Sequence, residues 1–313
     1  MTLAPATPAT PTRAPITPSR AWLLASRPAT LPAATVPVLI GAAVAIDERF
    51  TFRPLVFLVT LAAALLIQIG TNFANDYSDF HRGADHEGRL GPLRVTQSGL
   101  ISHDAVRRGI IIAFGLAAIL GCYLAWIGGW PIVAIGVASI LCGLAYTGGP
   151  WPFGYHGLGD AFVFVFFGLV AVTGTAYLQT GSWSTLAIVA SIPPGLLVTN
   201  ILVINNLRDL PTDSAAGKRT LAVRIGAPAT RAQYALFTAI AYAIPAVVAL
   251  AGPPARRWLL LPLLTLPLGA ALVRTILGGV SGRELNPMIR RTGLLLLSFG
   301  VLFSIGLILG RAR

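Results

Sequence analysis

The sequence predicts an all-α membrane protein with nine transmembrane helices, and three observations carry this prediction. Of its 313 residues, 55% are apolar and only 11% are charged. Many of the apolar runs approach or exceed about 18 residues, the length that an α-helix needs to cross the hydrocarbon core of a bilayer. The stretches between these runs are too short to hold a soluble domain of ordinary size.

The expected helices follow from the apolar segments taken in chain order. They are residues 22–46, 53–75, 105–127, 131–146, 158–178, 183–204, 231–251, 257–277 and 289–309. The first contains Pro28, Pro32 and Pro37, which a membrane helix tolerates where neighbouring helices satisfy the freed backbone groups. A short uncharged turn, Gly128–Pro131, joins the third to the fourth. The loop before the fifth, residues 147–157, is rich in glycine, proline and aromatic residues.

The residues before the first apolar segment have a different composition. Residues 1–19 are rich in proline, threonine and alanine, which predicts a disordered tail. Residues 20–313 are then expected to form a single transmembrane domain. We expect no cleavable signal peptide, because Arg20 and Arg27 lie at and within the start of the first apolar segment.

The distribution of basic residues predicts the orientation. The net charge is +12, but the 23 basic side chains are scattered over short loops, so they indicate topology and no nucleic-acid partner. With a cytoplasmic amino terminus, 17 of them lie on the inside and 6 on the outside. The positive-inside rule favours this arrangement, in the cell inner (plasma) membrane with the polar stretches described next facing the cytoplasm.

A first acidic stretch, Asn72 to Asp85, follows the second apolar segment directly. It holds Asp76, Asp79 and Asp85, three of only eleven acidic residues in the chain. Carboxylates at a membrane helix end are costly unless compensated, and at i, i+3 spacing they also repel one another. A divalent cation is the usual compensation, and Mg²⁺ prefers one or two carboxylates plus substrate phosphates. A solvated acidic loop that caps the helix explains the same residues.

A second stretch of the same design follows the sixth segment. Asparagines precede aspartates in both, and Gly217 follows Asp213 at the same four-residue spacing as Gly83 follows Asp79. This similarity indicates an internal repeat, in which two helix-end sites hold metals around one diphosphate. Lys218, the only lysine in the chain, is predicted to assist at the diphosphate. For most arginines, contact with lipid phosphates is the favoured alternative.

These residues resemble the UbiA superfamily of intramembrane aromatic prenyltransferases. That superfamily carries an Asn-Asp-x-x-Asp-x-x-x-Asp motif after its second helix and an Asp-x-x-x-Asp motif after its sixth. Here Asn75–Asp79 matches the first part, but Gly83 replaces its final aspartate and Asp85 follows two residues later. This departure resembles the 1,4-dihydroxy-2-naphthoate polyprenyltransferases of menaquinone synthesis. Five further segments resemble that branch: Arg27–Pro32, Tyr146–Pro150, Asn205–Asp209, Gly217–Arg224 and Leu285–Pro287.

The resemblance implies a fold of nine helices around a central cavity and a set of site residues. The implied Mg²⁺ or diphosphate contacts are Asn75, Asp76, Asp79, Asp85, Asp209 and Asp213. Asp79, Asp213, Lys218 and Tyr146 are expected to act in catalysis, with the Tyr146 ring facing the allylic cation. The expected substrate-binding residues are Asn72, Asn75, Asn205, Asn206, Arg208, Arg219, Arg27 and Asp160.

Several of these residues keep a second explanation. Tyr146 is equally typical of an interfacial aromatic anchor, and Asp160 of a helix cap. The aromatic residues Phe162, Phe164, Phe166 and Phe167 line a prenyl tunnel or face lipid. We expect His81 and His86 in solvated loops, and Cys122 and Cys142 as small core residues of the spans.

The expected activity is Mg²⁺-dependent transfer of a long polyprenyl chain from its diphosphate to 1,4-dihydroxy-2-naphthoate. Loss of CO₂ would restore aromaticity and give demethylmenaquinone. Two alternatives stay open: a prenyltransferase that uses another acceptor, and an ion-coupled membrane transporter. The helix-end position of the carboxylates disfavours the transporter, whose ions typically bind at mid-depth. The lipid bilayer is the expected environment, and the sequence leaves tail length and oligomeric state open.

Overall fold

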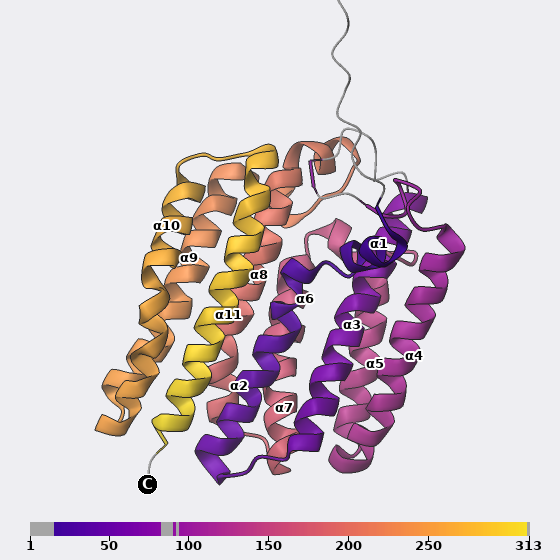
Figure 1. Cartoon of the computed structure of the whole chain (residues 1–313). Helices are drawn as coiled ribbons and strands as arrows, with labels where there is room; N and C mark the ends of the chain where they lie inside the picture. The colour runs from indigo at the N-terminus through magenta and orange to yellow at the C-terminus, as the bar shows by residue number, and fades with distance from the viewer. Residues whose placement is uncertain (1–15, 83–89, 92–93, 312–313) are drawn as a thin grey trace, which may run out of the picture.

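The computed structural model describes residues 16–82, 90–91 and 94–311, and every regular element in this part of the chain is helical (Figure 1). The α-helices are α1 (Pro18–Ala25), α2 (Pro32–Arg49), α3 (Pro54–His81), α4 (His103–Gly128), α5 (Trp130–Ala145), α6 (Gly159–Val163), α7 (Ala171–Thr180), α8 (Thr185–Ala215), α9 (Leu221–Ala251), α10 (Leu266–Leu277) and α11 (Asn286–Leu309). In the same part of the chain, four 3₁₀-helices and one π-helix connect them. The 3₁₀-helices are η1 (Pro28–Thr30), η2 (Phe153–His156), η4 (Pro254–Thr265) and η5 (Gly282–Leu285), and the π-helix is η3 (Phe164–Val170).

The membrane-compatible helices agree in part with the nine expected spans. Within the described residues, seven helical segments are long and apolar enough to cross a bilayer, and a bent pair, residues 18–30 with 32–49, makes an eighth if it counts as one span. The apolar helix α5 is shorter, at 16 residues. About 24 Å of helix at 1.5 Å per residue is less than the roughly 30 Å hydrocarbon core of a typical bilayer.

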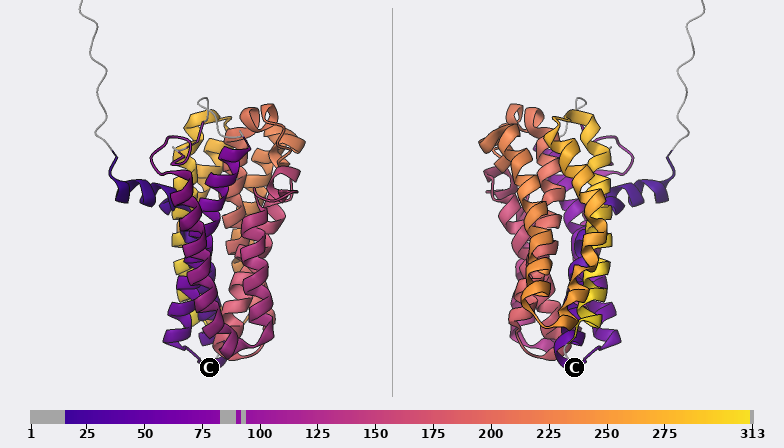
Figure 2. Two further views of the ribbon diagram at one scale, coloured as in Figure 1. Left: turned by 90° about the vertical axis from the view of Figure 1, so that its right-hand side faces the viewer. Right: turned by 90° about the vertical axis from the view of Figure 1, so that its left-hand side faces the viewer.

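The prediction of one continuous helix over residues 22–46 is wrong. The chain bends by 52° between the α1–η1 part and α2. Arg27 adopts a left-handed conformation with φ 51°, and Pro28 follows it, so the α1 helix cannot continue. Figure 2 shows α1 projecting sideways from the bundle near one end. Helix α1 begins at Pro18, so it includes the last two residues of the stretch 1–19 expected to be a tail.

Helices α3 and α8 extend farther than the expected spans 53–75 and 183–204 and include described aspartates of both acidic stretches. Helix α3 extends to His81 and carries Asp76 and Asp79, and α8 extends to Ala215 and carries Asp209 and Asp213. The helix α8 tolerates Pro193 and Pro194 inside it and is the most buried of the candidate spans. As a result, the four carboxylates sit on rigid backbone at one end of the bundle.

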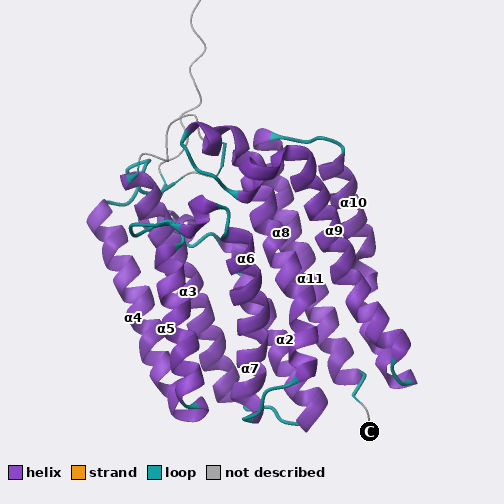
Figure 3. Ribbon diagram, turned by 180° about the vertical axis from the view of Figure 1, so that it is seen from behind, coloured by secondary structure: helices purple, strands orange, loops and turns teal. Residues whose placement is uncertain are grey.

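Close packing at small residues holds the long helices together. A Cβ added at Gly300 would lie 2.2 Å from Val36, and one added at Gly41 would lie 2.5 Å from the Val172 carbonyl oxygen. These contacts lock α2 against α11 and α7, because only glycine lets the helices approach so closely. Figure 3 shows α2 and α11 from behind, between the α3–α5 group and the α9–α10 group.

An ion pair lies at the end of the bundle opposite the acidic residues of α3 and α8. There the Arg256 guanidinium lies 2.8 Å from the buried Asp47 carboxylate.

The two cysteines are not core residues as expected, because Cys122 is exposed and Cys142 is half-buried.

Candidate functional site

A polar cavity lies where α3 and α8 end, and the loop between α5 and α6 covers it. Its volume is ≈ 90 Å³. Sixteen residues line it: Arg27, Asn75, Asp79, Arg94, Tyr146, Thr147, Gly154, Tyr155, Leu202, Asn205, Asn206, Asp209, Thr212, Asp213, Lys218 and Thr220. Both acidic stretches therefore contribute to one site, as the repeat in the sequence indicates.

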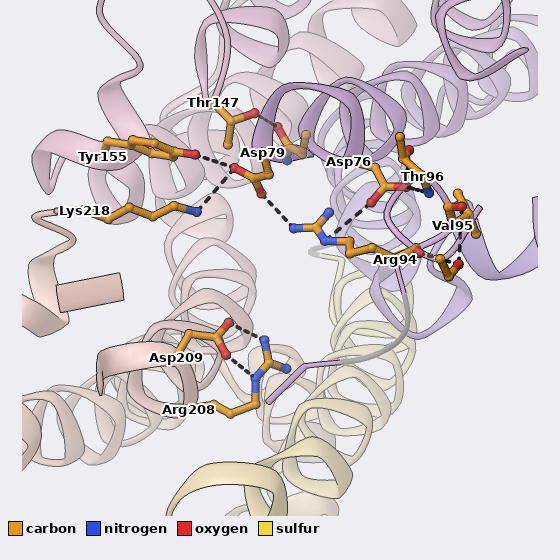
Figure 4. Close-up of polar contacts among 12 residues, drawn as sticks. Asp76, Asp79, Arg94, Val95, Thr96, Thr147, Tyr155, Arg208, Asp209 and Lys218 are labelled. Carbon is orange, nitrogen blue, oxygen red and sulfur yellow. Dashed lines mark hydrogen bonds and ion pairs between the residues drawn. The ribbon is translucent and has the colours of Figure 1, made fainter. Parts of the chain in front are cut away.

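Asp79 is the centre of the polar contacts in this cavity (Figure 4). Its Oδ2 lies 2.8 Å from Arg94 Nη2. Its Oδ1 accepts a hydrogen bond of 2.6 Å from the Tyr155 hydroxyl and lies 3.3 Å from Lys218 Nζ. Since the side chain is buried, these donors compensate a charge that water hardly reaches.

Asp76, one turn earlier in α3, faces a different partner. Its Oδ2 accepts hydrogen bonds from the Thr96 backbone N–H at 3.2 Å and the Thr96 hydroxyl at 3.0 Å. Arg94 Nε lies 3.5 Å from its Oδ1. Asp76 does not line the polar cavity. In this structure it anchors the segment that delivers Arg94 to Asp79.

The asparagines of the first stretch also divide between two positions. Asn75 lines the cavity, and its Oδ1 accepts a 2.8 Å hydrogen bond from the Thr147 hydroxyl. Asn72 lies outside the cavity, and its amide donates to the Ser26 carbonyl at 3.0 Å. Asn72 therefore ties α3 to the bend before α2. Asp85 and His86 lie outside the described residues.

The second stretch places Asp209 and Asp213 one turn apart on the cavity side of α8. Two nitrogens of Arg208 bind the two oxygens of Asp209, at 2.8 and 2.5 Å. A third nitrogen donates to Asn286 Oδ1 at 2.9 Å, so the fully buried Arg208 joins α8 to α11 and stays outside the cavity. Among the described residues, no cation lies within ion-pair distance of the Asp213 carboxylate.

The predicted cations take different places. Lys218 and Arg27 line the cavity, whereas Arg219 is exposed and does not. The backbone N–H of Arg219 instead donates to the Tyr155 carbonyl at 2.9 Å. The left-handed backbone at Arg27 aims that side chain from the bend before α2 toward the cavity.

Asp160 is buried but lies outside the polar cavity. Gln233 of α9 donates a 2.7 Å hydrogen bond to its Oδ2, and within the described residues its Oδ1 has no partner. The N-cap of α6 is Leu158, so Asp160 lies inside the first turn and not at the cap position. The observed contact joins α6 to α9.

Tyr146 lines both the polar cavity and an apolar cavity behind it. This near apolar cavity has a volume of ≈ 130 Å³ and is lined in part by Phe162, Phe166 and Phe167. Phe164 lines neither apolar cavity and packs toward Gly195. The position of Tyr146 makes it the boundary between polar and apolar surroundings.

A far apolar cavity of ≈ 330 Å³ continues toward the opposite end of the bundle. Its lining includes Leu178, near the end of α7, and Ile132, near the start of α5. The two apolar cavities share five lining residues, Ala64, Ile67, Ser139, Phe166 and Ala171. One polar and two apolar cavities are therefore arranged in series.

The donors around the polar cavity suit Mg²⁺. They are carboxylate and amide oxygens from Asp79, Asp209, Asp213, Asn75, Asn205 and Asn206. No group of three or more His, Cys, Asp or Glu side chains converges among the described residues. Mg²⁺ typically takes one or two carboxylates and completes its shell with water and substrate phosphate, so this donor set fits such a shared site.

Tyr155 and Thr147 are the site residues that sequence reasoning missed. Both lie in the loop 147–157, and although Thr147 belongs to the segment Tyr146–Pro150 that resembles the family branch, neither residue is given a role from the sequence. The predicted topology puts this loop at the same membrane face as both acidic stretches. This shared membrane face is the feature of the sequence that could have pointed to Tyr155 and Thr147.

Comparisons with known proteins agree on the fold and the family. A sequence model of the UbiA prenyltransferase family matches residues 34–307. The chain is 39% identical over 278 residues to a 1,4-dihydroxy-2-naphthoate octaprenyltransferase of Mycobacterium tuberculosis, covering 88% of this chain and 92% of that one. It is 36% identical to the protein of the same name from Escherichia coli, covering 94% and 96%.

Solved structures share the fold at low sequence identity. The apo structure of a UbiA homolog from Aeropyrum pernix superimposes with a TM-score of 0.64 at 15% identity, covering 89% of this chain and 96% of that one. A UbiA homolog from Archaeoglobus fulgidus bound to GPP and Mg²⁺ gives a TM-score of 0.58 at 15% identity, covering 91% and 99%.

Proposed function

Because the chain belongs to the UbiA prenyltransferase family, we propose that it transfers a long polyprenyl chain from its diphosphate to 1,4-dihydroxy-2-naphthoate. One observation carries this function: three cavities lie in series. The polar cavity adjoins the near apolar cavity at Tyr146, and the near apolar cavity adjoins the far one. This shape suits a molecule with a highly charged head and a long hydrocarbon tail. The acceptor follows from relatives named for it, which cover nearly the whole chain.

The diphosphate head would bind in the polar cavity with Mg²⁺. Asp213, which has no cation in contact among the described residues, and Asp79 and Asp209 would hold the metal, with Asn75, Asn205 and Asn206 as further oxygen donors. When bound, Mg²⁺ supplies positive charge that stabilises the leaving diphosphate. Lys218 and Arg27 add cationic donors from the cavity wall. Asp85 stays a predicted contact.

The chemical step is a transfer of the prenyl group from diphosphate to the naphthoate ring. The carbon–oxygen bond of the prenyl diphosphate breaks, diphosphate leaves, and the allylic carbon becomes electrophilic. The Tyr146 ring lies at the junction of the cavities. It would face that carbon and stabilise its developing positive charge. The electron-rich naphthoate ring forms the new carbon–carbon bond, and loss of CO₂ restores its aromaticity. No covalent enzyme intermediate is required.

The orientation belongs to the same proposal. Nine spans result if the bent pair and the short α5 each cross the bilayer. The amino terminus and the polar cavity would then face the cytoplasm of a plasma membrane, supported by the 17 to 6 division of basic residues. Cytosolic Mg²⁺ and acceptor would reach the cavity from that side.

The decisive experiment measures the product. Purified protein in liposomes receives octaprenyl diphosphate, Mg²⁺ and 1,4-dihydroxy-2-naphthoate in competition with other aromatic acceptors. We expect prenylated naphthoquinol, released CO₂ and diphosphate in equal amounts. Prenylation of a competing acceptor alone would replace the proposed acceptor. Ion flux across the liposome membrane without any prenylated product would favour a transporter.

A further inference from the structure

Tyr155 contacts parts of the site that come from both halves of the chain. It lies in η2, between α5 and α6, and lines the polar cavity. Its hydroxyl donates to Asp79 Oδ1 at 2.6 Å, and Lys218 Nζ lies 4.4 Å from the centre of its ring (Figure 4). Its carbonyl accepts a hydrogen bond from the N–H of Arg219, the residue after Lys218.

The three side chains contact one another, and the guanidinium of the exposed Arg82 lies farther from the centre of the Tyr155 ring, at 5.8 Å. Lys218 Nζ lies 3.3 Å from the same Asp79 oxygen that the Tyr155 hydroxyl binds. A metal that takes this oxygen would repel the ammonium, and Lys218 would lose its ionic partner. The ring contact does not involve Asp79 and would hold the ammonium in the cavity.

We propose that Tyr155 is a positioning residue for the diphosphate site, with a separate task for each part of its side chain. The hydroxyl fixes the orientation of the Asp79 carboxylate for metal binding, and the ring retains Lys218 beside the diphosphate once the metal is bound. This inference rests on the proposed function, because it takes the cavity as the site of Mg²⁺ and diphosphate.

Two substitutions separate the tasks. Tyr155→Phe removes the hydroxyl and keeps the ring, whereas Tyr155→Leu removes both. Groups that orient a metal ligand typically contribute about 10- to 100-fold to metal affinity. A cation–ring contact contributes roughly 2- to 30-fold. Tyr177→Phe is the matched control, because Tyr177 donates to the Gly128 carbonyl at the other end of the bundle.

The first measurement is binding to purified protein, with Mg²⁺ and inorganic diphosphate as the probe and titration calorimetry as the readout. Tyr155→Phe should weaken Mg²⁺ binding at least about 10-fold at saturating diphosphate. Tyr155→Leu should in addition weaken diphosphate binding at saturating Mg²⁺. With Lys218→Ala as the background, the Phe and Leu variants should bind diphosphate equally, because the ring then has no ammonium to hold and the exposed Arg82 guanidinium does not line the polar cavity.

The second measurement is steady-state kinetics. Tyr155→Leu should raise the KM for prenyl diphosphate and leave the KM for the acceptor unchanged. If both variants bind Mg²⁺ and diphosphate like the wild type, the inference is wrong, even where the wild type makes prenylated product. A wild type that binds Mg²⁺ and diphosphate but makes no such product would instead overturn the proposed function. A persistent Phe–Leu difference in the Lys218→Ala background would overturn the role of the ring.

Discussion

At the scale of single residues, Asp213 offers the cleanest test of the metal site. Its carboxylate lines the polar cavity and makes no ion pair among the described residues, so its removal breaks no observed contact. Asp213→Ala should lower turnover by about 100-fold or more, the usual effect of removing a group that stabilises transition-state charge. The assay is product formation at saturating Mg²⁺, with the exposed Asp104→Ala as control.

Asp79→Ala should lower turnover as strongly, but it also removes the carboxylate that Arg94, Tyr155 and Lys218 all contact. Loss of one member of a buried ionic group is destabilising, so a lower melting temperature is expected for this variant only. Turnover of Asp213→Ala near the wild-type value would contradict the two-stretch site.

Lys218 provides a second prediction at this scale. Lys218→Ala should lower turnover and raise the KM for prenyl diphosphate, with little change in the KM for the acceptor. Lys218→Arg should restore only part of the rate, because the planar guanidinium replaces a compact point charge. If Lys218→Ala leaves turnover and the KM for prenyl diphosphate unchanged and lowers only the yield of membrane-inserted protein, Lys218 acts as a topology determinant and not at the diphosphate.

The sequence predicted which residue types meet, but not which way each one turns. Asp79, Asp213, Lys218, Arg27 and Tyr146 line one cavity, as expected. The spacing of Asp76 and Asp79 puts both on one helical face. Asp76 nevertheless binds Thr96 in the segment that returns to α3, whereas Asp79 lines the polar cavity. Local periodicity cannot show where a distant loop returns.

At the scale of elements, glycine contacts should decide how α2 packs. Gly41→Ala should lower the free energy of unfolding by about 1–3 kcal/mol, the usual effect of overpacking, because its Cβ would meet the backbone of α7. Gly115→Ala in α4 is the control, since no atom lies within 4 Å of its added Cβ. Thermal unfolding in detergent compares the two, and equal stability would refute this view of the α2–α7 interface.

The apolar cavities lead to a prediction about tail length. Ala64 lines both cavities, so Ala64→Phe should reduce turnover with octaprenyl diphosphate more than with a short prenyl diphosphate. Ala134→Phe, on the exposed side of α5, should affect neither. An equal loss with long and short substrates would indicate that the tail lies elsewhere.

Helices were easier to predict than their interruptions. The apolar segments located the long helices well, but the bend at Arg27 depends on a left-handed backbone that composition does not reveal. The polar ends of α3 and α8 continue as helix because the bundle surrounds them, whereas Asn and Asp by themselves favour caps and turns.

At the scale of the whole molecule, the orientation is open to a direct test. Ser102 and Ser214 are exposed at the end that holds the polar cavity, and Thr185 is exposed at the other end. Each would be replaced by cysteine in a chain whose Cys122 and Cys142 are serine. In intact cells an impermeant maleimide should label only the Thr185→Cys variant. Rapid labelling at Ser102→Cys or Ser214→Cys would reverse the topology.

The junction at Tyr146 has a consequence for how such an enzyme must be measured. The tail-bearing reactant dissolves in the membrane and the naphthoate dissolves in water, and in the proposed mechanism both would have to reach the Tyr146 ring. The rate then depends on two unlike quantities, a mole fraction within the lipid and a molarity in solution. Adding empty vesicles that exchange lipid with the loaded ones dilutes the first without changing the second, so it would slow the reaction at constant total substrate.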